Sequence, residues 1–436
     1  MKRFFFGGIH PAYNKEMSTK SVEFHSVVPQ QVVIPLRQHI GAPCQPLVQV
    51  GDTVLRGQKI GDGEGMCVPV HASVSGTVVA IEPRPHTSGQ MVDAIVIQND
   101  MQNTDAEFMG CDLPTEELDV ETVLHTIREA GIVGMGGAAF PGNIKALSAL
   151  GHVDTLIANA CECEPYITAD DSLLKTAPEQ VLEGLMIIHH VLKPERVVLA
   201  VEDNKKVAIE RLKVLMKDYP LIELVILPTR YPQGSEKQLI QAVTNRQVPP
   251  GGLPSHVGCV VYNVSTFAAI YRAVRMGMPL FQRIVTISGE AIQAPQNFIV
   301  PIGTAFRDII EIAGGLNDKT ERVISGGPMM GFAQSDLSVP VVKATNSILC
   351  LLKDQNGQAE NPVCLRCGKC VSVCPMKLQP LYMYRFTLAG KVKELQRLNV
   401  LDCIECGSCA FTCPGKLPLV EKFRIGKKLV REAASK

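Results

Sequence analysis

The chain has 436 residues, of which 46% are hydrophobic, so it can bury several cores and is too long for one ordinary domain. Lysine plus arginine equal aspartate plus glutamate at 43 each, so the net charge favours neither nucleic acid nor an anionic surface as a general partner. The basic start precedes too few apolar residues for a secretory signal, and no apolar run reaches the ~18 to 20 residues that span a bilayer. Fifteen cysteines without an export signal indicate a reducing compartment, the cytoplasm, where close cysteine spacings bind metal.

The segment over 48–81 has short apolar stretches separated by glycine turns, a pattern typical of paired strands. It is similar to the barrel-sandwich fold of biotinyl and lipoyl carriers. Those carriers place a modified lysine after Glu-Ala-Met, whereas residues 64–67 read Glu-Gly-Met-Cys, so we expect no swinging arm. Cysteines outside the metal motifs are predicted to be small apolar fillers in the core, namely Cys44, Cys67, Cys111, Cys259 and Cys350.

A glycine-rich stretch is the first candidate cofactor loop. Gly134, Gly136 and Ala139 satisfy the relaxed dinucleotide fingerprint G-x-G-x-x-G/A, which requires a strand before it and a helix opening within it. The preceding residues 121–132 have helical periodicity instead, and Pro141 interrupts any helix that opens in the loop. A standard Rossmann turn is therefore disfavoured, but a loop of free amides that cradles a phosphate is compatible with the sequence.

Residues 155–171 run from an apolar strand into alternating cysteines and glutamates. If the extended geometry continues, Glu162 and Glu164 share one face, and Cys161 and Cys163 share the other. Paired carboxylates at a strand exit need hydrogen-bond donors, which a ribose, a nicotinamide amide or a flavin edge supplies. A solvated loop is the alternative. A metal site on the two cysteines is disfavoured because no third ligand is visible nearby.

A strand, a helix and a strand are predicted next, over 196–227. The strands are continuous apolar runs, as a parallel sheet covered on both faces requires, and the helix has an apolar face at i, i+4 and i+7. Two more strands and a helix are predicted over 284–315, in a stretch that resembles a β-grasp module. We assign both units to scaffold and partner contact rather than to chemistry.

Two copies of C-x2-C-x2-C-x3-C-P lie near the carboxyl end. In this ferredoxin pattern the first three thiolates of a copy bind one [4Fe-4S] cluster, and the fourth binds the other cluster. Zinc is the alternative, but a zinc knuckle gives no role to the third cysteine or to the Cys-Pro pair. The linker over 381–400 has the apolar periodicity of a helix. One cluster would take Cys364, Cys367, Cys370 and Cys413, and the other Cys403, Cys406, Cys409 and Cys374.

The segment over 416–436 contains seven basic and two acidic side chains. On a helix, such a run forms a solvated face. Because a redox module comes directly before it, docking to an acidic partner or to anionic lipid headgroups is an equal alternative.

Four segments carry a family resemblance: GIVGMGGAAFPGNIK, LIANACECEPY, YPQGSEKQLI and VVYNVSTFA. Their order and spacing resemble the flavoprotein subunit of respiratory complex I, which binds FMN and NADH. With its FFFGGIHP start and two-cluster end, the whole chain resembles the RnfC family, whose members belong to the Rnf ion-translocating ferredoxin:NAD oxidoreductases. The resemblance implies an α/β multidomain chain: a barrel-sandwich hybrid domain over 1–105, a Rossmann-like αβα FMN/NADH domain over 115–275, a β-grasp (SLBB) domain over 280–345, a two-cluster ferredoxin-like α-helical domain over 355–420, and a basic tail over 421–436.

The resemblance also implies roles at matching positions. Glu162 and Glu164 are expected to line the flavin and nicotinamide side as the catalytic pair, with Asn159 beside them. Tyr166 stands after Pro165, where the complex I loop has Gly-Thr, and is expected to stack on or gate the flavin. The other expected cofactor-binding residues are Gly134, Gly136, Gly137 and Lys145 at phosphate, Phe140 beside the cofactor, Gly234 and Glu236 along the dinucleotide, and Asn263 and Thr266 at FMN phosphate or ribityl oxygens.

Hydride transfer moves two electrons and each cluster moves one, so a chain of clusters needs a flavin to exchange with NADH. The resemblance implies hydride exchange between NAD(H) and FMN, then one-electron transfer through two [4Fe-4S] clusters to a ferredoxin-like iron–sulfur subunit and membrane-embedded subunits. The chain is expected to lie peripherally at the cytoplasmic face of the cell membrane and to bind no nucleic acid. Two alternatives stay open: a cobalamin reductase of the microcompartment type, and an electron-transfer adaptor that has lost its flavin.

Overall fold

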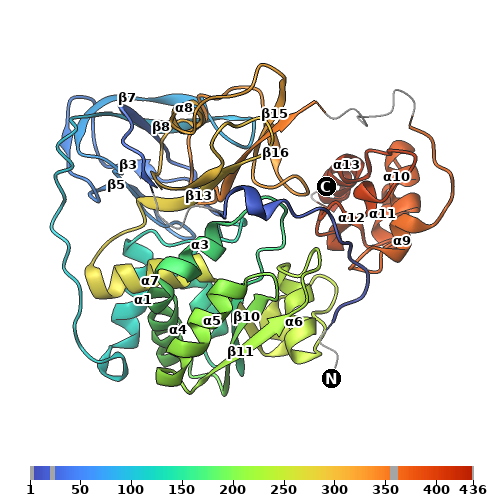
Figure 1. Cartoon of the computed structure of the whole chain (residues 1–436), viewed down its shortest axis with the longest axis horizontal. Coiled ribbons are helices and arrows are strands. Elements are labelled where there is room, and N and C mark those ends of the chain that lie inside the picture. Colours follow the sequence, from blue (N-terminus) through green and yellow to red (C-terminus); the bar gives the residue numbers. More distant parts are fainter. Residues whose placement is uncertain (1–3, 20–24, 354–361, 435–436) are drawn as a thin grey trace.

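Four folded units make up the chain in Figure 1. The computed structural model describes residues 4–19, 25–353 and 362–434. The β-rich units lie together, the central αβα unit packs beneath them, and the helical cysteine-rich unit stands to one side (Figure 1). The predicted α/β multidomain class is confirmed. Within the described residues, no helix has the length and apolar character needed to cross a bilayer.

The amino-terminal β unit consists of two small antiparallel sheets joined by glycine turns. Apolar side chains alternate along its strands, so Val32, Ile34 and Val78 lie fully buried between the sheets. The first sheet has the order β2 (Gln31–Pro35), β8 (Met91–Asn99), β7 (Gly76–Pro85) and β4 (Thr53–Val54), and the second has β3 (Gln45–Pro46), β5 (Lys59–Asp62) and β6 (Val70–His71).

The central unit is a four-stranded, all-parallel sheet with helices on both faces. Strand order is β11 (Ile222–Leu227), β10 (Arg196–Glu202), β9 (Thr155–Ala160) and β12 (Cys259–Asn263), so the chain reverses direction of travel across the sheet beside β9. Such a switch point opens a crevice at the carboxyl ends of the strands. The helices are α1 (Val120–Glu129), α2 (Gly142–Ala149), α3 (Ala169–Thr176), α4 (Pro178–Leu192), α5 (Lys206–Leu215), α6 (Glu236–Thr244) and α7 (Val264–Met276).

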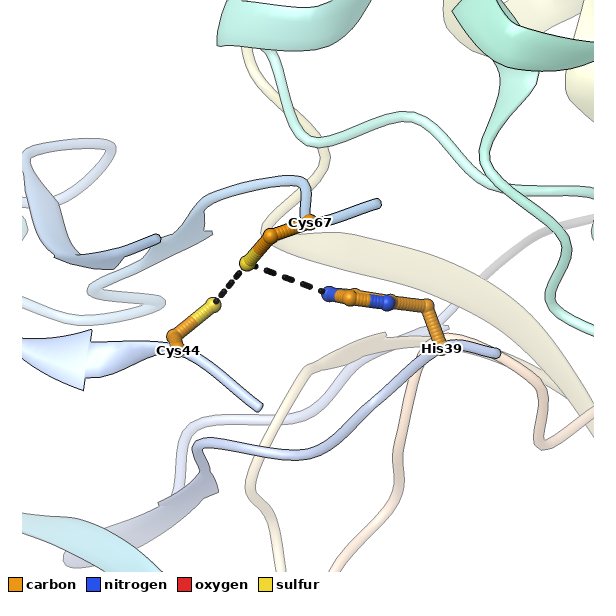
Figure 2. Close-up of side chains that lie close together, drawn as sticks. All are labelled: His39, Cys44 and Cys67. Atoms are coloured by element: carbon orange, nitrogen blue, oxygen red, sulfur yellow. Dashed lines mark hydrogen bonds between the residues drawn. The ribbon is translucent and has the colours of Figure 1, made fainter. Parts of the chain in front are cut away.

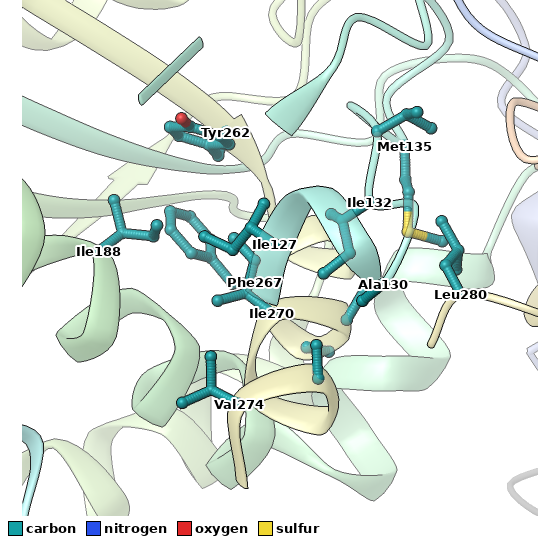
Figure 3. Close-up of a cluster of buried hydrophobic side chains, with 14 of the residues drawn as sticks. Ile127, Ala130, Ile132, Met135, Ile188, Tyr262, Phe267, Ile270, Val274 and Leu280 are labelled. Atoms are coloured by element: carbon teal, nitrogen blue, oxygen red, sulfur yellow. The ribbon is translucent and has the colours of Figure 1, made fainter. Parts of the chain in front are cut away.

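Apolar helix faces hold this unit together. Figure 3 shows Ile127 of α1, Ile188 of α4, and Phe267 and Ile270 of α7 meeting in one cluster, and all four are fully buried. Each such side chain contributes roughly 1.5–3 kcal/mol by leaving water. The packed helices give the strand ends, and the loops that leave them, a rigid base.

The β-grasp unit follows, and its two strands and helix over 284–315 are as predicted. Its mixed sheet also takes in β1 from the amino-terminal part of the chain. The order is β1 (His25–Ser26), β14 (Gln296–Pro301), β13 (Gln282–Ser288), β17 (Ser347–Leu352), β15 (Thr320–Ser325) and β16 (Phe332–Gln334), with α8 (Phe306–Ile312) against it.

The cysteine-rich unit is helical, and two sequence expectations change here. The single helix predicted over 381–400 is two helices, because the chain turns at Gly390 with φ +61°. The basic segment is not a separate tail: Phe423 and Val430 are buried in the core of this unit, so the division at residues 420 and 421 falls inside a helix. The helices are α9 (Lys369–Ser372), α10 (Pro380–Leu388), α11 (Val392–Arg397), α12 (Ser408–Phe411) and α13 (Leu419–Ala434). Short 3-10 helices are η1 (Lys15–Met17), η2 (Thr115–Glu117), η3 (Met216–Asp218), η4 (Pro254–Val257) and η5 (Val400–Asp402).

The first described residues leave the amino-terminal β unit and run between the central and cysteine-rich units, as the dark blue segment of Figure 1 shows. The amide of Gly8 donates to the carbonyl of Val373 over 2.8 Å, and Ile9 forms an antiparallel bridge with Tyr231. Gly7 has φ +73°, and a Cβ there would meet the carbonyl oxygen of Cys374 at 2.8 Å, so only glycine fits. This segment therefore fixes the seam between the two units.

Candidate functional site

A cavity of about 560 Å³ opens at the switch point of the parallel sheet. Its volume lies within the roughly 300–1,000 Å³ typical of cofactor and ligand sites. Gly137, Tyr166 and Thr266 are not among its lining residues. Ten of the sequence-predicted site residues line it: Gly134, Gly136, Phe140, Lys145, Asn159, Glu162, Glu164, Gly234, Glu236 and Asn263.

The glycine loop lies between α1 and α2 and forms one wall. Thr266 lies behind this wall, where its Oγ1 accepts a 3.0 Å hydrogen bond from the amide of Met135. Within the described part of the chain, the exposed amides of Gly136, Gly137 and Ala138 donate to no protein acceptor. Successive amides without a protein partner form a concavity that suits phosphate oxygens.

Lys145 brings a positive charge to the same end of the cavity. Its Nζ lies 2.8 Å from Oε1 of Glu236 and 5.3 Å from the ring centroid of Tyr262. Both partners belong to elements at the strand ends, α6 and β12. The lysine is therefore held at the cavity wall, within reach of an anionic group.

Two asparagines at the ends of β9 and β12 organise the floor. Asn159 Nδ2 donates to the carbonyl of Gly234 over 2.9 Å, which ties the glycine segment to the sheet. Asn263 Nδ2 donates to Asp170 over 2.7 Å, and Ser265 Oγ donates to the other oxygen of the same carboxylate. Burial, with the nearby Glu162, raises the pKa of Asp170 to about 6.

The two glutamates occupy different surroundings. The sequence expectation that they share a strand face is wrong, because β9 ends at Ala160 and the next residues form a turn closed by the amide of Cys163 on the carbonyl of Cys161. Glu162 accepts from the amide of Asp170 at 2.9 Å and from Lys205 at 3.2 Å. Burial opposes its ionisation, but Lys205 and Lys15 outweigh burial and lower the pKa of Glu162.

Glu164 instead reaches toward the β-grasp unit. Its Oε2 accepts from the amide of Met329 at 3.2 Å, and a Cβ on Gly327 would collide with that oxygen. Burial raises the pKa of Glu164 to about 7. The cavity thus holds one carboxylate that stays ionised and one that titrates near neutrality.

A lysine from the amino-terminal segment supports this turn from below. Lys15 is buried, and its Nζ donates to the carbonyls of Glu164 at 2.9 Å and Ile167 at 2.5 Å. Burial, with Lys205 nearby, lowers the pKa of Lys15 to about 8. The segment that precedes the β-rich unit therefore helps to position the glutamate turn.

Tyr166 points away from the cavity wall. It has φ +68°, its amide donates to the carbonyl of Tyr13, and its hydroxyl donates to Glu290 over 2.5 Å. In this arrangement Tyr166 joins the glutamate turn to the β-grasp unit rather than covering the cavity.

Each group of four cysteines surrounds its own small hollow in the cysteine-rich unit. The motif copies are built alike: Gly368 and Gly407 have φ +75° and +76°, and each precedes a one-turn helix. Amides also approach the thiols, as in Leu378 N to Cys374 Sγ at 3.4 Å. The donor set of four thiols in each hollow suits a [4Fe-4S] cluster. One hollow is lined by Cys364, Cys367, Cys370 and Cys413, and the other by Cys374, Cys403, Cys406 and Cys409.

The second hollow adjoins the large cavity. Ile404 lines both, and the hydroxyl of Tyr231, itself a cavity residue, donates to the carbonyl of Cys406 over 2.7 Å. Among the cluster-site cysteines, Cys367 of the other hollow is exposed. One cysteine group therefore lies next to the cavity, and the other reaches the surface.

Sequence reasoning missed several lining residues that tertiary structure brings in. Met330 comes from the β-grasp unit, Ile404 from the second cysteine motif, and Ile40 from the loop after β2. The paired glycines before Met330 were an available signal of a close approach, whereas nothing local marks Ile40 or Ile404 as site residues.

Comparison with known families assigns each unit. The sequence matches the Nuo51 FMN-binding domain over residues 127–272 and a 4Fe-4S dicluster domain over 358–414. It also matches the RnfC barrel sandwich hybrid domain over 3–102 and the SLBB domain over 284–333. With the cavity and the two cysteine groups, these matches define an iron–sulfur flavoprotein with FMN and two [4Fe-4S] clusters as its cofactors.

Full-length relatives narrow this class. The chain is 44% identical over 97% of its length, and 96% of the relative, to the RnfC-type subunit of the Na(+)-translocating ferredoxin:NAD(+) oxidoreductase complex of Acetobacterium woodii. It is also 44% identical, over 87% of its length and 83% of the relative, to the corresponding subunit of the proton-translocating complex of Clostridium ljungdahlii. The chain belongs to the RnfC family of ion-translocating oxidoreductase complexes.

A solved structure shares the fold. An NAD+-reducing [NiFe]-hydrogenase in its H2-reduced state aligns with TM-score 0.50 and 20% identity, covering 74% of this chain and 64% of the hydrogenase chain. The predicted family, fold class and cofactor set are confirmed by these comparisons, and the cobalamin-reductase alternative is not favoured.

Proposed function

We propose that this chain is the peripheral subunit through which an ion-translocating ferredoxin:NAD(+) oxidoreductase exchanges electrons with NAD(H). The relatives named above act in such complexes, and the cavity has room and polar groups for a flavin. FMN, when bound, supplies the conversion between hydride transfer and one-electron transfer. The chain's own residues bind, orient and shield the reactants.

The FMN phosphate is assigned to the end of the cavity with the glycine loop. The amides of Gly136, Gly137 and Ala138 have no acceptor among the described residues, and Lys145 stands nearby. Amide donors and one cation together compensate the charge of a phosphate. The ribityl oxygens fall to Asn263, which is oriented by Asp170.

The nicotinamide side is assigned to the glutamate turn. Glu162, kept ionised by Lys205, offers a fixed acceptor to ribose or amide donors. Glu164 accepts or donates according to pH, because its pKa is about 7. Apolar side chains such as Met330 and Ile404 exclude water from this end of the cavity.

The observation that carries the electron route is Ile404, which lines both the cavity and the hollow of Cys374, Cys403, Cys406 and Cys409. The cluster held there is the one next to the flavin. The cluster of the other hollow, beside exposed Cys367, is then the exit.

The exit is assigned to a second iron–sulfur subunit of the complex at the cytoplasmic face of the membrane. Around Cys367, the side chains of Val363 and Leu365 are 62% and 64% exposed, and Phe411 is 54% exposed. Apolar groups beside an exposed cluster ligand suit a protein partner that excludes water from the transfer path.

An anaerobic NADH titration of the FMN-loaded chain tests the proposal. The visible absorbance of the clusters should bleach, and a paramagnetic signal of reduced [4Fe-4S] should appear. A loaded chain whose clusters remain oxidised with NADH, yet are reduced by dithionite, contradicts the NAD(H) assignment. A chain that retains no FMN when intact favours the flavin-less adaptor instead.

A further inference from the structure

Two cysteines and a histidine that the electron route does not use meet in the core of the amino-terminal β unit. His39 lies in the loop after β2, Cys44 stands directly before β3, and Cys67 lies between β5 and β6. They are 6%, 2% and 1% exposed. Figure 2 shows the two thiols and the imidazole pointing toward one another from three separate parts of the chain.

The spacing of their ligand atoms matches a metal site. Sγ of Cys44 lies 3.5 Å from Sγ of Cys67, which lies 3.7 Å from Nε2 of His39, and all three atoms fall within 4.8 Å of one another. With Zn–S of about 2.3 Å and Zn–N of about 2.0 Å, a tetrahedral ion separates two sulfurs by about 3.8 Å, and a sulfur and nitrogen by about 3.5 Å. The side chains need to move by only a few tenths of an ångström to bind zinc.

The surroundings orient these ligands. Nδ1 of His39 lies 3.2 Å from the carbonyl of Ile40, so a proton on Nδ1 leaves the Nε2 lone pair directed at the thiols. The carbonyl of Val68 lies 3.3 Å from Sγ of Cys44 and 4.0 Å from Sγ of Cys67. It is an oxygen at hand for a fourth position, while the Val68 amide competes for Nε2 at 3.3 Å.

Charge at the site is also balanced. Lys343 is buried nearby, with its Nζ 2.6 Å from the carbonyls of Pro69 and Gly131. Two thiolates with one divalent ion carry no net charge, so burying the set costs less than burying isolated thiolates. Two core thiols that serve only as filler do not account for an imidazole nitrogen aimed at them, and neither does a disulfide between Cys44 and Cys67.

We propose that His39, Cys44 and Cys67 bind a structural zinc ion. The ion fixes the loop over 39–44, and that loop supports the cofactor cavity. The amide of Ile40 donates to the carbonyl of Ala139 in the glycine loop over 3.1 Å, and Ile40 also lines the cavity. The site is separate from the cluster cysteines and replaces the filler role predicted for Cys44 and Cys67.

The test is metal analysis and zinc-edge X-ray absorption on the full chain, purified with its clusters and its iron content measured. The expected result is about one zinc per chain, with two sulfur neighbours at about 2.3 Å and nitrogen or oxygen at about 2.0 Å. The zinc edge is separate from the iron edge, so the clusters do not obscure it. This measurement needs no variant.

Variants then locate the ion. Cys44→Ser and Cys67→Ser should each lower zinc content at least about tenfold, because removing one ligand of three leaves no closed site. Cys350→Ser is the matched control: it changes a fully buried cysteine in the β-grasp unit and should keep the zinc. An iron-replete chain without zinc, zinc surrounded by four sulfurs as in a misloaded cluster site, or zinc retained in both site variants overturns the proposal.

Discussion

The hydroxyl of Tyr231, on the flavin side, donates a 2.7 Å hydrogen bond to the carbonyl oxygen of Cys406, a proposed cluster ligand. The same hydroxyl lies 3.5 Å from Glu164, and Tyr231 is fully buried. One side chain thus contacts the proposed nicotinamide end of the cavity and the neighbouring cysteine group, across the seam between two units.

Tyr231→Phe should loosen this seam. It leaves a buried carbonyl without its donor, which costs about 1–3 kcal/mol of folding free energy. NADH should reduce the flavin at the normal rate in stopped-flow measurements, while cluster reduction slows. Tyr219→Phe, which loses a hydroxyl bonded to Glu183 far from the seam, is the control: stability falls and cluster reduction does not. An unchanged cluster rate in Tyr231→Phe would show that the seam does not limit transfer.

Glu164→Gln should flatten the dependence of stability on pH. The pKa of Glu164 is about 7 in the folded chain against an ordinary value of 4.5, so the folded state binds more protons between these pH values. The free energy of unfolding therefore falls as pH rises through this window, by up to about 3 kcal/mol from this group. Glutamine cannot ionise, so that part of the fall disappears.

The measurement is the thermal midpoint at pH 5, 6, 7 and 8. A residual slope remains in Glu164→Gln because burial also raises the pKa of Glu202 to about 7. Glu210→Gln, at an exposed glutamate paired with Lys213, should keep the full slope. Equal slopes for Glu164→Gln and the unmodified chain would mean that Glu164 does not titrate in this range.

Cys374→Ser and Cys413→Ser should have unequal effects. Cys374 belongs to the first motif copy but lines the hollow next to the cavity, whereas Cys413 lines the outer hollow. Cys374→Ser should therefore abolish reduction of both clusters by NADH, and Cys413→Ser should spare the inner cluster. Paramagnetic spectra after NADH, compared with spectra after dithionite, separate the two cases. The reverse pattern would invert the proposed order of the clusters.

Lys145→Gln should weaken FMN binding. A hydrogen bond to a charged group contributes about 1.5–3 kcal/mol, so the dissociation constant should rise about 10- to 100-fold. Fluorescence titration of the flavin-stripped chain measures this constant. Lys213→Gln, at an exposed lysine on α5, should bind FMN normally. If Lys145→Gln retains normal affinity, the phosphate lies elsewhere in the cavity.

Local patterns predicted the elements of the fold well. The apolar runs of β10 and β11 with the helix between them, and the glycine-separated strands of the β unit, are as expected because hydrophobic period and turn residues determine such elements. The linker helix over 381–400 failed at Gly390, where one residue with positive φ outweighs the periodicity on either side.

The candidate site was harder to predict because its walls come from distant parts of the chain. The glycine loop and the glutamate turn carry recognisable sequence, but the surroundings of Glu164 depend on Gly327 and Met329 of another unit. The burial that raises its pKa is a property of that contact. The alternation expected of Glu162 and Glu164 failed because the strand ends before them, a boundary that periodicity does not locate.

The contacts of Gly8 with Val373, and of Ile9 with Tyr231, join the start of the sequence to segments hundreds of residues away. Such pairings carry a large loop-closure entropy, so they are expected to form late in folding. Assembly of the individual units would then precede alignment of the conducting path. A nascent chain that has already acquired its cofactors stays electrically disconnected until this last closure.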